Sequence, residues 1–341
     1  MLAATVQADV FNLGGVRDPL TGTWTGLASL ETVPVGDPGN PGELSGASAG
    51  GYGPGRICGA VAYTYNIGKF EVTAGQYTEF LNAVAATDTY GLYNTRMASD
   101  GWGSECNIQR SGSPGSYKYS VAPESANRPV NYVWWGDAAR FANWLNNGQL
   151  KGEQDLNTTE DGAYFLNGAT SEAGQVLVTR KANAKWALPT EDEWYKAAYY
   201  KGGANAGYWD YATGNDSPPG RDMNDISGNN ANYGSRLMLP PFPNSTTAVG
   251  EFQDSASPYG TFDQSGNVWE WDEAIMYGSY RGLRGGDFWD PFIYASYRNY
   301  NTDPLFENNN IGFRVVQVPE PATLSLLALG GLAALRRRQP V

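Results

Sequence analysis

Glycine is the residue type that most limits what this chain can fold into. The sequence has 43 glycines and 20 prolines among 341 residues, and only 17% of the residues are charged. Because glycine and proline favour turns and interrupt regular elements, long charged helices are disfavoured. The 22 tyrosines and 11 tryptophans supply large rings for a core. We therefore expect a loop-rich globular protein that packs around aromatic side chains.

Three amphipathic helices are predicted among these loops. Thr73 and Gln76 form a capping box, and apolar residues follow them at helical spacing. A second helix is expected from about Gly136, and a third begins at Thr190, with Glu193 in its first turn. Short aromatic and β-branched runs predict strands at 65–70, 266–271, 284–289 and 311–316. A few helices set among short antiparallel strands indicate an α+β fold.

The sequence contains no histidine. This excludes Ser-His-Asp and Cys-His nucleophile pairs, zinc sites of the HExxH type, and His-ligated iron or copper. The net charge of −12 repels phosphate backbones, so nucleic acid is not expected as a partner. The acidic side chains either hold a hard cation such as calcium or simply keep the protein soluble.

The only cysteines are Cys58 and Cys106. A structural disulfide in an oxidising compartment is the leading prediction. Two unpaired thiols are the next alternative, and a reactive or metal-binding pair is the third. No CxxC spacing supports redox catalysis.

The two ends of the chain carry targeting signals. Pro319, Glu320 and Pro321 precede an apolar run at 322–335 and an arginine cluster at 336–338. The run is shorter than the roughly 20 residues of a bilayer span, which favours a transient sorting helix over an anchor or an amphipathic core helix. The tail resembles the PEP-CTERM sorting signal. That resemblance implies export, transient membrane contact, cleavage by an exosortase-type protease, and residence in the cell envelope or extracellular matrix.

At the other end, residues 1–8 finish with Val6-Gln7-Ala8, a small-residue pattern like those that signal peptidases cut. We interpret them as the remnant of a signal peptide, so the mature chain is expected to begin near Asp9. The predicted divisions are the remnant at 1–8, a Gly/Pro-rich lead-in at 9–59, the main domain at 60–317 and the sorting signal at 318–341.

Six short motifs occur in a characteristic order between about residues 63 and 316. They are 67–73 (IGKFEVT), 129–132 (PVNY), 188–194 (LPTEDEW), 266–271 (GNVWEW), 284–286 (RGG) and 312–314 (GFR). In this order they resemble the formylglycine-generating-enzyme, or sulfatase-modifying factor, family. The resemblance implies a loop-rich variant of the C-type lectin fold. Independently of it, we expect Trp194, Trp269 and Trp271 to be core anchors, and Arg284 and Arg314 to pair with carboxylates.

The chemistry of that family is not supported by this sequence. In catalytic members a serine and two cysteines follow Arg-Gly-Gly, and the paired thiolates bind copper. Carried across residue by residue, these positions hold Asp287, Asp290 and Ala295. The related iron enzymes need histidines, which are absent. We therefore expect no copper, no iron and no catalytic residues.

The resemblance also implies a structural calcium site. It places ligands on the side chains of Asp263 and Glu270 and on the backbone carbonyls of Gly266 and Val268. The alternative for Glu270 is a structural salt bridge. A second family site would use Asn232 and the Tyr233 carbonyl, but its expected acid falls in 239–244, where there is none.

Two classes of function follow. The first is a non-catalytic binding or matrix protein that takes polysaccharide, or a surface protein, on the segment 287–310. Its candidate contacts combine flat rings with amides, which suits a glycan: Trp289, Tyr294, Tyr297, Tyr300 and Asn301. The alternative is that these aromatics are buried and the asparagines only form turns. The second class is an enzyme of the family with altered chemistry, using carboxylates such as Asp287 and Asp290.

Overall fold

The computed structural model describes most of the chain. The described residues are 16–17, 24–25, 29–99, 103–203, 207–235, 245–299 and 302–319, with only the backbone described at 16–17 and 24–25. The expected signal-peptide remnant at 1–8 and the sorting helix at 322–335 lie outside these ranges. Within them, no helix is both long and apolar enough to cross a bilayer.

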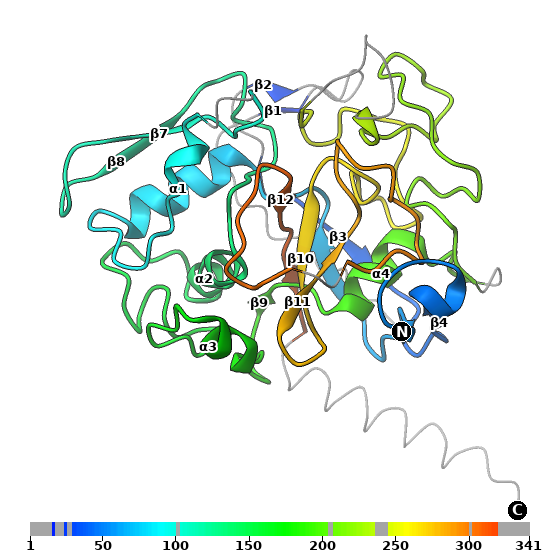
Figure 1. Ribbon diagram of the computed structural model, residues 1–341, viewed down its shortest axis with the longest axis horizontal. Helices are drawn as coiled ribbons and strands as arrows, with labels where there is room; N and C mark the ends of the chain where they lie inside the picture. The colour runs from blue at the N-terminus through cyan, green and yellow to red at the C-terminus, as the bar shows by residue number, and fades with distance from the viewer. Residues whose placement is uncertain are drawn as a thin grey trace, which may run out of the picture.

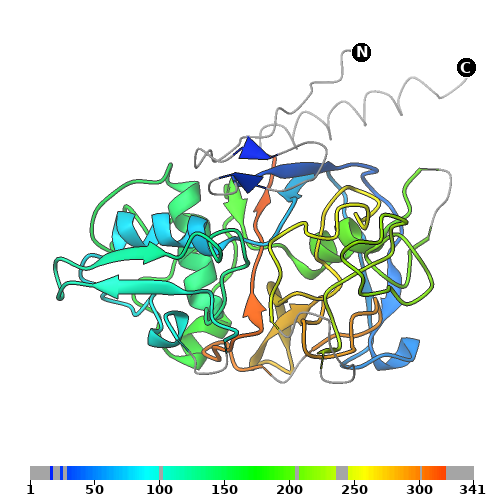
Figure 2. The same cartoon turned by 90° about the horizontal axis from the view of Figure 1, so that it is seen from above.

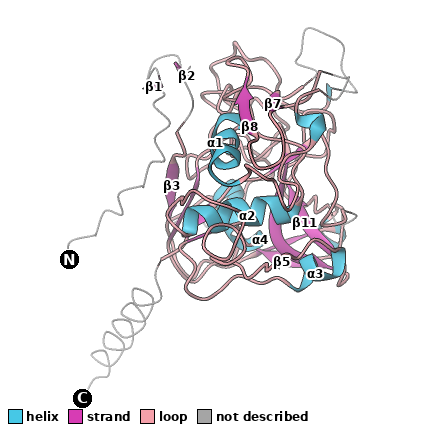
Figure 3. Cartoon of the chain, turned by 90° about the vertical axis from the view of Figure 1, so that its left-hand side faces the viewer, coloured by secondary structure: helices cyan, strands magenta, loops and turns pink. Residues whose placement is uncertain are grey.

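Short helices and strands are set in long loops, as the glycine content predicts (Figures 1 and 3). The helices are α1 (Ala74–Val84), α2 (Trp135–Asn146), α3 (Glu172–Leu177) and α4 (Glu191–Tyr199), with 3-10 turns η1 (Ala47–Ala49) and η2 (Thr95–Met97). The strands are β1 (Val16–Arg17), β2 (Trp24–Thr25), β3 (Thr32–Val35), β4 (Glu43–Ser45), β5 (Arg56–Cys58), β6 (Tyr65–Gly68), β7 (Ile108–Ser111), β8 (Lys118–Val121), β9 (Trp186–Ala187), β10 (Trp269–Met276), β11 (Tyr280–Arg284), β12 (Ile311–Gly312) and β13 (Val316–Gln317).

Both predicted capping boxes form. Thr73 caps α1 and accepts from the Gln76 backbone, while the Gln76 side chain accepts from the Thr73 backbone. Thr190 and Glu193 make the same reciprocal pair at the start of α4. The predicted helix from about Gly136 is α2. The third predicted helix is α4, which ends at Tyr199, before Gly202 and Gly203.

Two sheets organise the core. A four-stranded sheet has the order β3-β6-β13-β9, with antiparallel neighbours. A three-stranded sheet has the order β11-β10-β12, in which β10 pairs antiparallel with β11 and parallel with β12. The predicted strand at 311–316 is thus divided into β12 and β13, which belong to different sheets.

The structured domain begins before residue 60. Strand β3 pairs with β6 along its whole length, from Thr32 opposite Gly68 to Val35 opposite Tyr65. The part of the expected lead-in from residue 29 onward is therefore integral to the domain. The lead-in boundary at residue 59 marks the start of the family motifs and not of the folded unit.

The core is anchored by tryptophans, as expected. Trp194 and Trp271 are fully buried and Trp269 is 3% exposed. The Trp194 indole donates to the Glu270 carboxylate at 2.8 Å, and the Trp271 indole donates to the Val133 carbonyl at 3.0 Å. Burying these rings is favourable because each polar N–H keeps a partner.

Candidate functional site

The segment that carries the family's catalytic positions begins with a tight turn after β11. Gly285 and Gly286 have φ values of 98° and 79°, which disfavour residues with a side chain. A Cβ on Gly286 would lie 2.6 Å from Ile293 Cγ2 and 2.8 Å from the Phe292 carbonyl oxygen. The predicted strand at 284–289 therefore ends at Arg284, and the chain folds back on itself.

Asp287 holds this turn together. Its side chain is fully buried, and Oδ1 accepts hydrogen bonds from the backbone of Trp289 at 2.8 Å and of Asp290 at 2.5 Å. The other oxygen accepts from the side-chain amide of Asn310. Burial raises the pKa of Asp287 to about 6. The carboxylate that replaces the family's serine thus organises the loop.

Ala295, at the position of the family's second cysteine, is also buried. It belongs to the apolar cluster that contains Cys58 and Trp194, and its carbonyl accepts from Arg284 at 2.8 Å and from the Ser45 hydroxyl at 2.9 Å. The Cys58 thiol lies 3.3 Å from Arg284 Nη2. Burial raises the pKa of Cys58 to about 11, so this thiol is protonated at neutral pH. One protonated thiol cannot supply the paired thiolates that copper requires.

The structure corrects the predicted disulfide. Cys58 and Cys106 are both buried free thiols. They belong to separate core clusters: Cys58 packs with Trp194, and Cys106 packs in the main core, where its backbone N–H donates to the Asn131 side chain at 3.0 Å. Burial raises the pKa of Cys106 to about 12.

Three arginines converge on one buried carboxylate beside this segment. Glu191, at the first position of α4, accepts from Arg284 at 2.7 Å, from Arg298 at 2.6 Å and from Arg56 at 3.0 Å. Burial alone would raise the pKa of Glu191, but the guanidinium groups of Arg284, Arg298 and Arg56 outweigh burial and lower it to about 2. The expected pairing of Arg284 with a carboxylate is confirmed.

Rings from two distant segments form a surface over this network. Tyr297 stacks with Phe292 at 4.9 Å and with Tyr52 at 5.0 Å between ring centroids, and Tyr294 meets it edge-on at 5.8 Å. All four rings are half-buried, whereas Trp289 on the same loop is 49% exposed. We call these five residues the aromatic surface.

The predicted ligand residues have different surroundings in the structure. Trp289 and Tyr294 reach solvent, as a binding role requires. Tyr297 is half-buried and stacks with both Phe292 and Tyr52, so its neighbours cover part of its ring. Tyr300 and Asn301 lie outside the described residues. Asn310 donates to Asp287, so this asparagine stabilises the turn. This agrees with the alternative in which the asparagines only form turns.

Tyr52 was missed by sequence analysis because it lies in the expected lead-in. The loop of residues 46–54, which we call the N-terminal loop, pairs with the segment around Ser296. The backbone N–H groups of Gly46 and Tyr52 donate to the Ser296 carbonyl at 3.0 and 3.3 Å, and Arg298 donates to the Tyr52 carbonyl at 3.0 Å. The Gly-rich composition of 36–55 was the only signal that the chain approaches another backbone there.

The predicted calcium ligands lie in a buried acidic region. Glu270 is fully buried and forms a two-pronged pair with Arg314, with N–O distances of 2.5 and 2.6 Å. The predicted salt bridge of Glu270 is thus present. Burial and the charges of Asp263 and Glu270 raise the pKa of Glu71 well above its usual value. Among the described residues, Glu71 Oε1 is buried without a hydrogen-bond partner.

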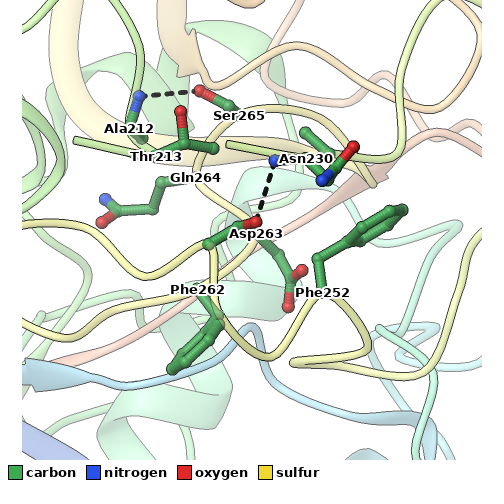
Figure 4. Close-up of a pocket in the computed structure, with 10 residues that line it drawn as sticks. Ala212, Thr213, Asn230, Phe252, Phe262, Asp263, Gln264 and Ser265 are labelled. Atoms are coloured by element: carbon green, nitrogen blue, oxygen red, sulfur yellow. Dashed lines mark hydrogen bonds between the residues drawn. The ribbon is translucent and has the colours of Figure 1, made fainter. Parts of the chain in front are cut away.

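Asp263 sits in a strained loop at the edge of this region. Its φ is 64°, and its carboxylate accepts from the Gly250 backbone at 2.6 Å. It also lines a void of about 10 Å³, room for about one water molecule, with Asn230, Phe252 and Phe262 (Figure 4). Burial raises the pKa of Asp263 to about 6. Excess negative charge, an unpartnered oxygen and a strained loop fit a bound cation.

The second calcium position is incomplete. Asn232 Oδ1 is buried without a hydrogen-bond partner among the described residues, while its amide donates to the Ser245 carbonyl at 2.9 Å. The residues after Tyr233 where an acid was expected, 239–244, fall outside the described ranges. In the described part of the chain, no three acidic or cysteine side chains are grouped as a metal site.

The sulfatase-modifying factor enzyme 1-like domain matches residues 60–319, and the PEP-CTERM protein-sorting motif matches residues 317–339. No curated protein sequence matches the chain significantly.

Two solved structures are similar to this one. Treponema denticola variable protein 1 has 20% sequence identity and a TM-score of 0.54, over 92% of this chain and 99% of that chain. CarF has 22% identity and a TM-score of 0.51, over 85% of this chain and 98% of that chain. At these identities the likeness shows the fold, and the predicted loop-rich variant of the C-type lectin fold is confirmed.

Proposed function

Because the chain belongs to the family of the sulfatase-modifying factor enzyme 1-like domain, we propose that it keeps the family's scaffold without its chemistry and serves as a non-catalytic binding protein. The sorting motif indicates an exported protein of the cell envelope and implies sorting by an exosortase. The proposed ligand is extracellular polysaccharide.

This proposal rests on the residues at the family's catalytic positions, which have structural roles here. Asp287 is committed to hydrogen bonds within its own turn, and Ala295 is buried against Cys58. The carboxylate alternative is weakened by the same bonds, because a general acid or base must reach a substrate proton. Asp290, the other acid at these positions, is partly exposed on the same loop.

The aromatic surface supports a glycan as the ligand. Sugar rings present flat apolar faces that stack on aromatic side chains, and exposed rings of this kind need no conformational change to bind. Trp289 is the best contact because about half of its surface is open to solvent, at 49%. The Tyr297 stack beneath Tyr294 holds that ring in place.

The orientation of the domain suits this role. β13, after which the described chain ends at Pro319, lies on one side of the molecule in Figure 2. The segment around 285–299 and the N-terminal loop lie on the other side (Figure 2). A tail held at the membrane during sorting would leave the aromatic surface facing outward.

The test is binding of the purified protein to matrix polysaccharide from the producing cells. Trp289→Ala and Tyr294→Ala should each weaken binding, whereas Phe165→Ala should not, although Phe165 is similarly exposed at 54%. Equal binding by all four proteins would show that the aromatic surface is not the site.

We also propose a structural calcium ion held by Asp263, Glu270 and the carbonyls of Gly266 and Val268. The support is that three acids, Glu71, Asp263 and Glu270, lie around Arg314. In addition, one oxygen of Glu71 has no hydrogen-bond partner among the described residues. When bound, calcium would supply positive charge and order the loop.

A further inference from the structure

A concavity lies beside the Glu191 network, with Glu191, Arg56 and Arg298 in its lining. We call it the Arg56 pocket, and its volume is about 590 Å³, within the range of about 300–1,000 Å³ that small-molecule sites occupy. It lies between β5, the start of α4 and the far end of β10. Its lining includes Arg56, Tyr63, Asp192, Glu273, Ile275 and Arg298.

The polar groups at the mouth of this pocket are held in fixed positions. Arg56 donates to Glu191 at 3.0 Å and to Asp192 at 2.5 Å. The other oxygen of Asp192 accepts from the Gly59 backbone at 2.9 Å. The Arg56 and Asp192 side chains are 41% and 24% exposed, so both remain accessible from solvent. Groups fixed in this way lose little conformational entropy when a ligand binds.

The charges of the pocket wall are balanced within the protein. Glu191 is surrounded by Arg56, Arg284 and Arg298, and Glu273 pairs with Arg180 at 2.9 Å. A strongly charged ligand would therefore have to break an existing pair. A neutral ligand could use both donors and acceptors at the mouth without doing so.

The rest of the lining is apolar and small. Ala60, Ala62 and Ala274 contribute methyl groups, and Ile275 is 41% exposed. The Tyr63 hydroxyl donates to Glu193 at 2.7 Å, which fixes its ring. Paired charged groups beside apolar patches match a sugar, which has hydroxyls at its edge and C–H groups on its faces.

The pocket and the aromatic surface share two chain segments. The Arg298 backbone bonds to Tyr52 of the aromatic surface, while the Arg298 side chain lines the pocket. Arg56 follows Tyr52 in the same segment, at the start of β5. We propose that the Arg56 pocket binds one neutral sugar unit of the polysaccharide that lies on the aromatic surface. This inference rests on the proposed function and specifies the ligand further.

Calorimetric titration with free neutral mono- and disaccharides, and with matching uronic acids and amino sugars, tests the pocket directly. We expect saturable binding of neutral sugars. Ile275→Trp, which fills the pocket, and Asp192→Asn, which keeps its shape, should each weaken that binding by about ten-fold or more, a loss of about 1.4 kcal/mol. Ile57→Trp is the control, because Ile57 is 56% exposed on β5 and does not line the pocket.

The outcomes separate the pocket from the proposed function. If the polysaccharide binds and no free neutral sugar does, the pocket assignment is wrong and the function stands. Binding of charged sugars alone would refute the argument from balanced charges. Neutral-sugar binding that survives both pocket variants would place the site elsewhere. If neither polymer nor free sugar binds, both proposals fail.

Discussion

Replacing Glu191 by glutamine should remove a large part of the stability of this domain. The carboxylate is 1% exposed and accepts five hydrogen bonds from Arg56, Arg284 and Arg298. Removing one partner of a buried ionic network costs about 3–5 kcal/mol, because the remaining charges stay buried. The same arginines hold the pKa of Glu191 below its usual value, at about 2, so they stabilise its charged form. We therefore expect Glu191→Gln to lose about 3 kcal/mol of unfolding free energy.

Urea denaturation at neutral pH measures this loss. Asp192→Asn is the control: its ion pair with Arg56 is partly exposed, and exposed pairs contribute about 1 kcal/mol or less. Because the folded pKa of Glu191 lies below its unfolded value, its contribution is complete above pH 4.5 and is lost as the pH falls toward about 2. The acid-induced loss in the wild type should be smaller in Glu191→Gln. A variant within about 1 kcal/mol of the wild type would refute the reasoning.

Two further predictions concern the N-terminal loop and calcium. Gly51→Ala places a Cβ against the Ser296 carbonyl, so it should destabilise the domain by on the order of 1–3 kcal/mol, whereas Gly36→Ala, with nothing within 4 Å, should not; equal thermal melting of the two variants would contradict the packing. Calcium should raise the melting temperature of the wild type but not of an Asp263→Asn, Glu270→Gln double variant, and an equal rise in both would exclude this site.

Local signals made α1, α2 and α4 predictable, whereas α3, which Ser171 caps, was not predicted. Thr73 and Thr190 lie within three residues of their capping partners, so the sequence itself contains both halves of each interaction. The family motifs then predicted the fold, because several of them hold residues that meet in the core. Glu270 and Arg314, for example, come from two different motifs and form a buried pair.

Contacts between distant segments were not predictable. The pairing of β3 with β6 and the approach of the N-terminal loop to Ser296 join the expected lead-in, for which composition gives only loops, to later parts of the chain. The same limit explains why the predicted disulfide was wrong. The spacing of Cys58 and Cys106 in the sequence does not show that they are buried in two separate clusters. The convergence of three arginines on Glu191 likewise depends on tertiary structure, and the Arg56 pocket arises from it.

We propose that this domain does not carry out the oxidation chemistry of its family. The most direct measurement is mass spectrometry of a sulfatase-type cysteine peptide after incubation with the purified protein and oxygen, with and without copper. Because Asp287, Asp290 and Ala295 occupy the family's catalytic positions and Cys58 is a single buried thiol, we predict that the peptide keeps its cysteine in both conditions. Formation of the formylglycine aldehyde would contradict the account.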